Sequence, residues 1–310
     1  CNRYARELLA RAVEENVITA QLADEIIGAD QSTQKGIEAQ RSRVEELRRK
    51  LATSSWADAK QLDSVAEYLV ARSVWIVGGD GWAYDIGYGG LDHVIASGAN
   101  VNLLVLDTEV YSNTGGQMSK STPRAATAKF AAGGKPTAKK DLAMMAMTYG
   151  NVYVARVSLA NPAHLVKTLV EAEAYNGPSL ILCYAHCISH GIDTTLGVEE
   201  QKKAVACGHW PLMRYNPDLA AGGENPLKLD SKEPTMSFEE YAYGENRYRV
   251  LKKVNPDAAA RLMELAEEDT RKRWHLYEQL AKLSVKTEEI SGNGAREGSV
   301  EAVRTEAKTD

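Results

Sequence analysis

Two short apolar runs, at residues 74–77 and 101–106, show no alternation of apolar and polar positions. Such runs are typical of strands buried on both faces of a parallel sheet. Residues 85–97, between them, carry apolar side chains at helical spacing and end before Gly98, which favours a crossover helix. The stretch 73–117 therefore predicts a strand, a glycine turn, a helix and a second strand.

The same alternation continues downstream. Residues 141–149 predict a helix closed by Gly150, and residues 152–157 predict a strand. A helix over 162–175 follows, with Asn161 as its cap and Pro162 in its first turn, and then a buried strand over 179–184. Four parallel strands with their crossovers indicate the α/β class, with a doubly wound, mostly parallel sheet.

The flanking segments have a different pattern. Residues 1–72 carry apolar side chains at helical spacing and predict a helical segment packed on the sheet domain. The α/β domain is expected over 73–283, with an irregular stretch at 210–255, short strands at 210–215 and 227–229, and a long charged helix over 256–283. Residues 284–310 are rich in Ser, Gly, Glu, Lys and Thr, which predicts a disordered tail.

Composition excludes several classes of protein. With 44% apolar residues, a chain of 310 residues can build a sizeable core. The net charge of −5 favours no nucleic-acid partner, and no apolar run has membrane-spanning length. Four cysteines in a chain this long predict no disulfide framework, which favours a reducing, cytoplasmic setting. Because the chain begins at Cys1 without methionine, we interpret it as a fragment or processed piece.

The loop after the first strand is Gly78-Gly79-Asp80-Gly81. Its glycines let the backbone approach a ligand closely, and the following helix favours a phosphate. A dinucleotide fingerprint would have no acid inside this turn. Because a carboxylate repels a diphosphate unless a metal lies between them, Asp80 favours a magnesium diphosphate. The alternative is an aspartate that caps the following helix.

A second polar loop, residues 107–117, leaves the next strand at the same carboxyl edge of the sheet, where such folds bind ligands. Thr108 and Asp80 can share one hard cation through their oxygen atoms. The alternative is an ordinary loop threonine that bonds to the backbone.

The two loops together form a motif. GDG, one βαβ unit and then a polar metal-binding loop resembles the thiamine diphosphate motif. The sequences TEVYSNTGGQ at 108–117, SKSTP at 119–123 and KFAAGGK at 129–135 are similar to pyruvate:ferredoxin (flavodoxin) oxidoreductases. The resemblance extends over residues 75–283 and is most specific over 78–135.

The resemblance implies roles for individual residues. Mg²⁺ would be held by the side chains of Asp80 and Thr108 and by the main-chain carbonyl of Val110. Residues 79–82 would cradle the diphosphate: Gly79, Asp80, Gly81 and Trp82. Asn113 would be catalytic, beside the thiazolium ring and the substrate. Its alternative role is that of a turn former before Thr114-Gly115-Gly116.

Cys187 begins the sequence Cys-Ile-Ser-His-Gly, which is similar to the segment that supplies one thiolate to the 4Fe–4S cluster nearest thiamine. The resemblance implies that the other three ligands, a C-x-x-C pair and a further upstream cysteine, lie outside this chain. Cys183 falls in an apolar strand and Cys207 in a helix, and both are expected to belong to the core. A free thiol is the alternative for Cys187. His186 and His190 are expected to be solvated or to support their neighbours, with metal ligation as the alternative.

The post-motif loop is basic, with Lys120, Arg124, Lys129 and Lys135. These side chains could meet phosphate, an acidic carrier protein or another subunit. The alternative is a solvated loop.

The resemblance implies the oxidative decarboxylation of pyruvate with coenzyme A to acetyl-CoA and CO₂. Electrons would pass through 4Fe–4S clusters to ferredoxin or flavodoxin, in a homodimer of the whole enzyme. The fragment alone is expected to be inactive, because upstream domains or another subunit must complete the site. Three alternatives stay open. The first is another 2-oxoacid:ferredoxin oxidoreductase or a non-redox thiamine enzyme of the decarboxylase or acetolactate synthase type. The second is a cofactor-binding or assembly module, and the third is a dinucleotide dehydrogenase, which Asp80 disfavours.

Overall fold

The computed structural model describes residues 2–284. The predicted disordered tail, apart from residue 284, lies outside the described residues. The chain begins with a helical bundle whose elements are α1 (Asn2–Glu14), α2 (Ala20–Ile27), α3 (Gln34–Ala52), α4 (Ala59–Val65) and the 3₁₀ helix η1 (Ala66–Leu69). Thr19 and Thr33 cap α2 and α3 by accepting a hydrogen bond from a backbone amide in the first turn.

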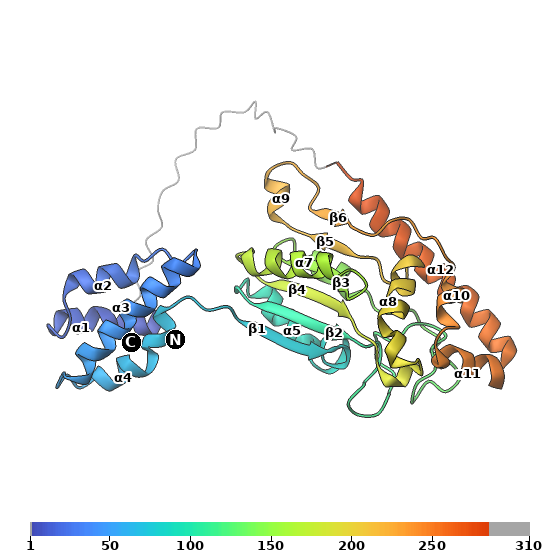
Figure 1. Cartoon of the computed structure of the whole chain (residues 1–310), viewed down its shortest axis with the longest axis horizontal. Coiled ribbons are helices and arrows are strands. Elements are labelled where there is room, and N and C mark those ends of the chain that lie inside the picture. The colour runs from blue at the N-terminus through green and yellow to red at the C-terminus, as the bar shows by residue number, and fades with distance from the viewer. Residues whose placement is uncertain (1, 285–310) are drawn as a thin grey trace, which may run out of the picture.

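The bundle has an apolar core of its own, separate from the cores of the sheet. The buried Gln40 amide group donates to the carbonyls of Ile26 and Leu69, which ties α3 to the ends of α2 and η1. Figure 1 shows the bundle beyond the end of the sheet at which β1 begins, joined to β1 by an extended segment. The helical prediction is therefore confirmed in the described residues, but the bundle buries its apolar side chains internally and is not packed on the sheet as predicted.

The central sheet has six strands in the order β1-β2-β4-β3-β5-β6. The first four strands in this order are parallel, whereas β5 and β6 extend the sheet in antiparallel fashion. The strands are β1 (Trp75–Gly79), β2 (Asn102–Asp107), β3 (Tyr153–Ser158), β4 (Ser179–Tyr184), β5 (Met213–Tyr215) and β6 (Leu227–Leu229). The predicted mostly parallel α/β sheet is confirmed.

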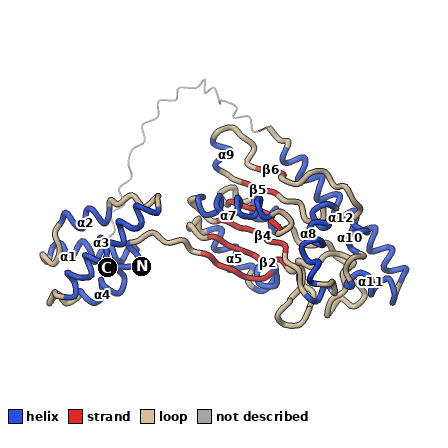
Figure 2. Tube along the Cα trace, in the orientation of Figure 1, coloured by secondary structure: helices blue, strands red, loops and turns tan. Residues whose placement is uncertain are grey.

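Helices cover the two sides of the sheet unequally (Figure 2). One face carries the larger core, formed with α5 (Tyr88–Ala96), α6 (Leu142–Met147), α8 (Gly197–Ala206), α10 (Phe238–Ala242), α11 (Asn246–Val254) and α12 (Pro256–Ala281). On the opposite face, α7 (Pro162–Ala174) packs on β3 and β4. The remaining short elements are the π-helix η2 (Gly81–Ile86), the 3₁₀ helices η3 (Ile188–His190) and η4 (Thr194–Leu196), and α9 (Asp218–Ala221).

One prediction about burial is wrong. β3 and β4 are buried along their whole length, but β1 alternates between exposed and partly buried residues. Val77 is 58% exposed, and Leu106 at the end of β2 is 40% exposed. The reason is that β1 is an edge strand and that α7 covers only the β3–β4 part of its face.

The predicted crossover helix also differs, because the chain turns first through η2 and only then enters α5. Residues 108–141 contain no helix or extended strand, yet many of their side chains are buried and isolated bridges such as Gln117–Lys129 tie them together. Among residues 2–284, no helix is both long and apolar enough to cross a membrane.

Candidate functional site

Two loops meet at the carboxyl edge of the sheet, where β1 and β2 end side by side. The Thr108 Oγ1 atom lies 2.8 Å from Asp80 Oδ1 and 2.9 Å from the main-chain oxygen of Val110. A threonine hydroxyl has one proton, so it cannot donate fully to both acceptors. Thr108 Oγ1 thus lies within hydrogen-bond distance of both other oxygen atoms, and such a group of oxygen donors suits a hard cation such as Mg²⁺.

Asp80 itself is buried, with 1% of its surface exposed. Burial, together with repulsion from Asp107, raises the pKa of Asp80 to about 7, against the hydrogen bonds from Ser119 and Thr108. Ser119 Oγ donates to Asp80 Oδ2 at 2.6 Å. Among the described residues Asp80 forms no ion pair, so a bound cation would relieve the desolvated carboxylate. The residues present fit a magnesium ion.

Glu109 fixes the shape of the loop of residues 107–117, which we call the metal loop. It is a non-glycine residue with a positive φ of 57°, and it lies between Thr108 and Val110. Its buried carboxylate accepts from Lys139 at 3.1 Å, His209 at 2.9 Å and Arg247 at 2.7 Å. Burial opposes the ionised form, but these three neighbours hold the pKa of Glu109 well below its usual value. The anchored carboxylate offsets the backbone strain and holds the loop in which the Thr108 hydroxyl contacts both Asp80 and the Val110 carbonyl.

Asp107, at the end of β2, lies in the same buried network. It accepts hydrogen bonds from Tyr84 at 2.7 Å, Lys139 at 2.8 Å and Ser121 at 2.5 Å. Sequence reasoning missed Glu109 and Lys139. An acid between two predicted ligands, followed by a Lys-Lys pair within the same loop, was the available signal.

The glycines of the first loop have distinct roles. A Cβ atom at Gly81 would overlap with the Tyr111 ring, and one at Gly78 would overlap with the Trp82 ring. At Gly79 the only atom near a Cβ position is the Leu106 main-chain oxygen, 4.0 Å away. The packing of the chain therefore explains Gly78 and Gly81 but leaves room at Gly79, as a closely approaching ligand would require. Because the Trp82 side chain packs against glycine backbone, its contribution to a ligand would come from the main chain.

Asn113 lies in an exposed turn that is closed by the bridge between Tyr111 and Gln117. Asn113 lies on the same loop as Thr108, one residue after Ser112, and among the described residues the side chains that donate to Asp80 are those of Thr108 and Ser119. Ser112 Oγ is 3.0 Å from Cys187 Sγ, so the loop that carries Asn113 touches the segment after β4.

Cys187 differs from the other described cysteines. Burial raises the pKa of a thiol, but hydrogen bonds from Ser112 and Ser189 outweigh this effect and lower the pKa of Cys187. By contrast, burial raises the pKa of Cys183 to about 11 and that of Cys207 to about 12. Cys183 and Cys207 belong to apolar cores, as predicted. Only Cys187 among the three combines a position at the loop edge with a thiolate-favouring environment.

Two of the four basic residues that follow the motif, Arg124 and Lys135, form their hydrogen bonds within the chain. Lys135 is buried and donates to the carbonyls of Thr122 and Lys120. Arg124 Nε donates to Asp269 on α12 at 2.6 Å. Neither side chain is free to meet an external phosphate, whereas Lys120 and Lys129 are exposed.

Residues 60–183 match the family described as "Thiamine pyrophosphate enzyme, C-terminal TPP binding domain". The pyruvate-flavodoxin oxidoreductase of Trichormus variabilis is 54% identical over 282 residues, which is 89% of this chain and 24% of that protein. The pyruvate:ferredoxin oxidoreductase of Moorella thermoacetica is 60% identical over 221 residues, which is 71% of this chain and 19% of that protein. The chain thus spans about a fifth to a quarter of the length of these relatives.

Among solved structures, a 2-oxoglutarate:ferredoxin oxidoreductase from Magnetococcus marinus matches 46% of each chain with 23% identity and a TM-score of 0.37. A likeness at this level carries no argument about function.

Proposed function

From the premise that this chain belongs to the pyruvate:ferredoxin (flavodoxin) oxidoreductase family through its thiamine-diphosphate-binding domain, we propose that it supplies the diphosphate and magnesium site of an enzyme that oxidatively decarboxylates pyruvate. Coenzyme A would accept the acetyl group. The observation that carries the proposal is that Thr108 Oγ1 lies 2.8 Å from Asp80 Oδ1 and 2.9 Å from the Val110 carbonyl oxygen.

These three oxygen donors would hold Mg²⁺, and the main chain of residues 79–82 would lie against the diphosphate. When bound, thiamine diphosphate supplies a carbon nucleophile that takes up a 2-oxo acid and releases CO₂. The chain's part is to bind and orient: Glu109 and Lys139 hold the metal loop in shape, and the Asn113 amide can donate to the carboxylate or carbonyl oxygen of the substrate.

Cys187 would ligate the 4Fe–4S cluster nearest thiamine, with the other ligands supplied from outside this chain. Its lowered pKa and its contact with Ser112, on the loop of Asn113, support this role. Electrons would leave through this cluster and others toward ferredoxin or flavodoxin. We propose that other parts of the enzyme complete the site and that the chain by itself is inactive. The whole enzyme would be a homodimer in the cytoplasm. The exposed apolar side chains of β1 and β2 support such a covering partner.

A second candidate function is a thiamine enzyme without redox chemistry. Such an enzyme needs the magnesium site but has no use for a thiolate at Cys187. The two candidates are therefore separated by variants at different positions.

The test uses the full-length protein that contains this chain, assayed for pyruvate-dependent reduction of a one-electron dye in the presence of coenzyme A. Asp80→Asn is expected to abolish activity together with magnesium-dependent cofactor binding. Cys187→Ser is expected to lower dye reduction and iron content while leaving cofactor binding intact. Full activity and full iron content in the Cys187→Ser protein would contradict the redox assignment and favour the second candidate.

A further inference from the structure

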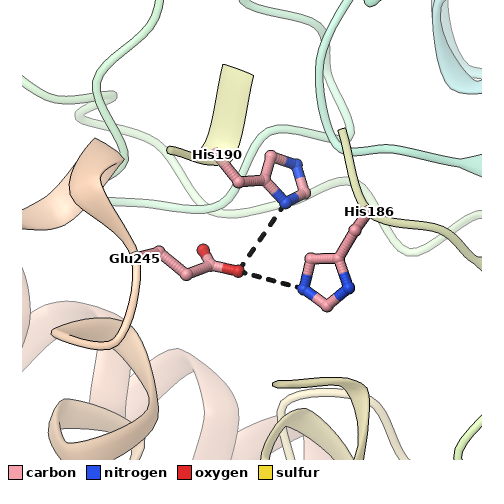
Figure 3. A group of neighbouring side chains, drawn as sticks. All are labelled: His186, His190 and Glu245. Carbon is pink, nitrogen blue, oxygen red and sulfur yellow. Dashed lines mark ion pairs between the residues drawn. The ribbon is translucent and has the colours of Figure 1, made fainter. Parts of the chain in front are cut away.

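Three side chains next to the loop of residues 107–117 form a cluster that the proposed function does not use: His186, His190 and Glu245 (Figure 3). His186 and His190 come from the segment after β4, and Glu245 directly precedes α11. His186 Nε2 lies 3.4 Å and His190 Nδ1 lies 3.6 Å from Glu245 Oε1, and the three atoms lie within 4.8 Å of one another. The side chains of His190 and Glu245 are fully buried, and that of His186 is 9% exposed.

The hydrogen bonding fixes the tautomer of His190. Its Nε2 atom lies 2.7 Å from the carbonyl oxygen of Thr108. Because a carbonyl oxygen can only accept, Nε2 must carry a proton, and in the neutral ring Nδ1 then presents a lone pair to the Glu245 carboxylate. Among the described residues His190 Nδ1 and both ring nitrogens of His186 have no hydrogen-bond partner. A lone pair that faces a buried carboxylate oxygen is unfavourable unless a positive ion lies between them.

The spacing of Glu245 Oε1 from each of the two histidine nitrogens fits a tetrahedral metal. With zinc–nitrogen and zinc–oxygen bonds of about 2.0–2.1 Å, the donor atoms of a tetrahedron lie about 3.3–3.4 Å apart. The distances from Glu245 Oε1 to the two rings are 3.4 and 3.6 Å. Metal-binding histidines commonly donate their other ring N–H to a carbonyl, and His190 does so to Thr108.

The carboxylate is also held in place from its other side. Arg247 Nε donates to Glu245 Oε2 at 2.5 Å, and Tyr241 donates to Oε1 at 3.1 Å. These two donors orient Glu245 so that Oε1 faces both histidines, whereas the charge of Arg247 is taken up by Oε2 and by Glu109.

We propose that His186, His190 and Glu245 bind a transition-metal ion of the zinc class, at a site separate from the magnesium site. Two imidazole nitrogens and one carboxylate oxygen suit Zn²⁺, whereas the all-oxygen group at Asp80 suits Mg²⁺. The ion would join the segment after β4 to the start of α11. It would also brace Thr108, whose carbonyl bonds to His190 and whose hydroxyl faces Asp80. The proposal does not depend on thiamine.

The test is metal analysis of the full-length protein after exchange into chelator-free buffer with one equivalent of Zn²⁺ and excess Mg²⁺. We expect the wild-type protein to bind one more zinc ion per chain than the His186→Gln protein binds. His186 is the variant of choice because its ring makes no hydrogen bond, so the fold is expected to tolerate the change. His275→Gln is the matched control, since His275 is exposed on α12.

X-ray absorption at the zinc edge identifies the donors. The expected spectrum of the wild-type protein shows nitrogen and oxygen neighbours at about 2.0–2.2 Å, and the His275→Gln protein gives the same spectrum. Equal zinc content in the wild-type and His186→Gln proteins, or sulfur neighbours at about 2.3 Å, would overturn the proposal. Because this readout requires neither thiamine diphosphate nor pyruvate, its failure is distinguishable from failure of the thiamine assignment.

Discussion

At the scale of single residues, the site depends on a carboxylate that is kept out of water. Asp80 is buried and repelled by Asp107, and its pKa is raised to about 7. A metal ion must therefore displace a proton over part of the physiological pH range. This competition gives Asp80 a measurable signature.

We predict that the affinity for Mg²⁺ falls about tenfold between pH 8 and pH 6, as follows from a proton that competes at a pKa of about 7. In the metal-free protein, the contribution of Asp80 to folding stability changes with pH in the opposite direction to the affinity for Mg²⁺. Because the folded pKa lies above the unfolded value, the contribution of Asp80 to stability is fully present below the unfolded pKa and is lost as pH rises through about 7. Magnesium titrations at several pH values measure the first effect, and an affinity constant from pH 6 to pH 8 would contradict it.

Glu109 offers a second test at this scale. Glu109→Gln keeps the size of the side chain but removes the charge that pairs with Lys139 and Arg247. We expect Mg²⁺ to bind about 10–100-fold more weakly, the usual effect of removing a residue that orients metal ligands. Glu264→Gln, an exposed change on α12, is the control. If both variants bind Mg²⁺ like the wild-type protein, Glu109 does not shape the loop.

The sequence was most informative for residues whose chemistry is local. Asp80, Thr108 and Val110 could be predicted because a short motif resembles a known metal loop, and the structure brings their oxygen atoms together. Glu109 has a local signal, since it lies between two predicted ligands, but its partner Arg247 lies 138 residues away in the sequence and reaches it only after folding. Metal ligation by His186 and His190 was an alternative from the sequence, but their neighbour Glu245 was missed because it is remote from them in the chain.

At the scale of elements, the fold follows from the hydrophobic pattern where both faces of an element are covered. β3, β4 and α12 occur where the pattern predicts them. For β1 the apolar run predicted burial on both faces, which is wrong, because such a run does not show whether another element covers the strand. The π-turn of η2 was also unpredicted, because the helical spacing of side chains does not distinguish a π-turn from an α-turn at the start of a helix.

The close approach of η2 to the metal loop can be tested with one glycine. In Gly81→Val the new side chain would overlap with the Tyr111 ring. We expect the ring and its loop to be displaced and magnesium-dependent binding of thiamine diphosphate to fall at least tenfold. Gly89→Ala is the matched control, because a Cβ atom there has no neighbour within 4 Å. Unchanged binding in Gly81→Val would show that this contact does not position the site.

At the scale of the whole molecule, the described residues form a helical bundle with its own core and a sheet with a core on each face. The edge strand β1 leads directly to Asp80 and leaves apolar side chains exposed beside it. This asymmetry fits a domain that is completed by other parts of a larger enzyme. The sequence predicted both the helical segment and the α/β domain. It did not predict the exposed apolar side chains of β1, because their exposure depends on β1 being the edge strand.

The central claim is that Asp80 anchors a magnesium-dependent thiamine diphosphate site. The most direct measurement is calorimetric titration of thiamine diphosphate, with and without Mg²⁺, into the metal-depleted full-length protein and its Asp80→Asn and Asp257→Asn variants. Asp257 is an exposed aspartate at the start of α12 and serves as the matched control. We predict magnesium-dependent binding in the wild-type and Asp257→Asn proteins and its loss in Asp80→Asn. Equal binding by all three proteins, or binding independent of magnesium, would contradict the claim.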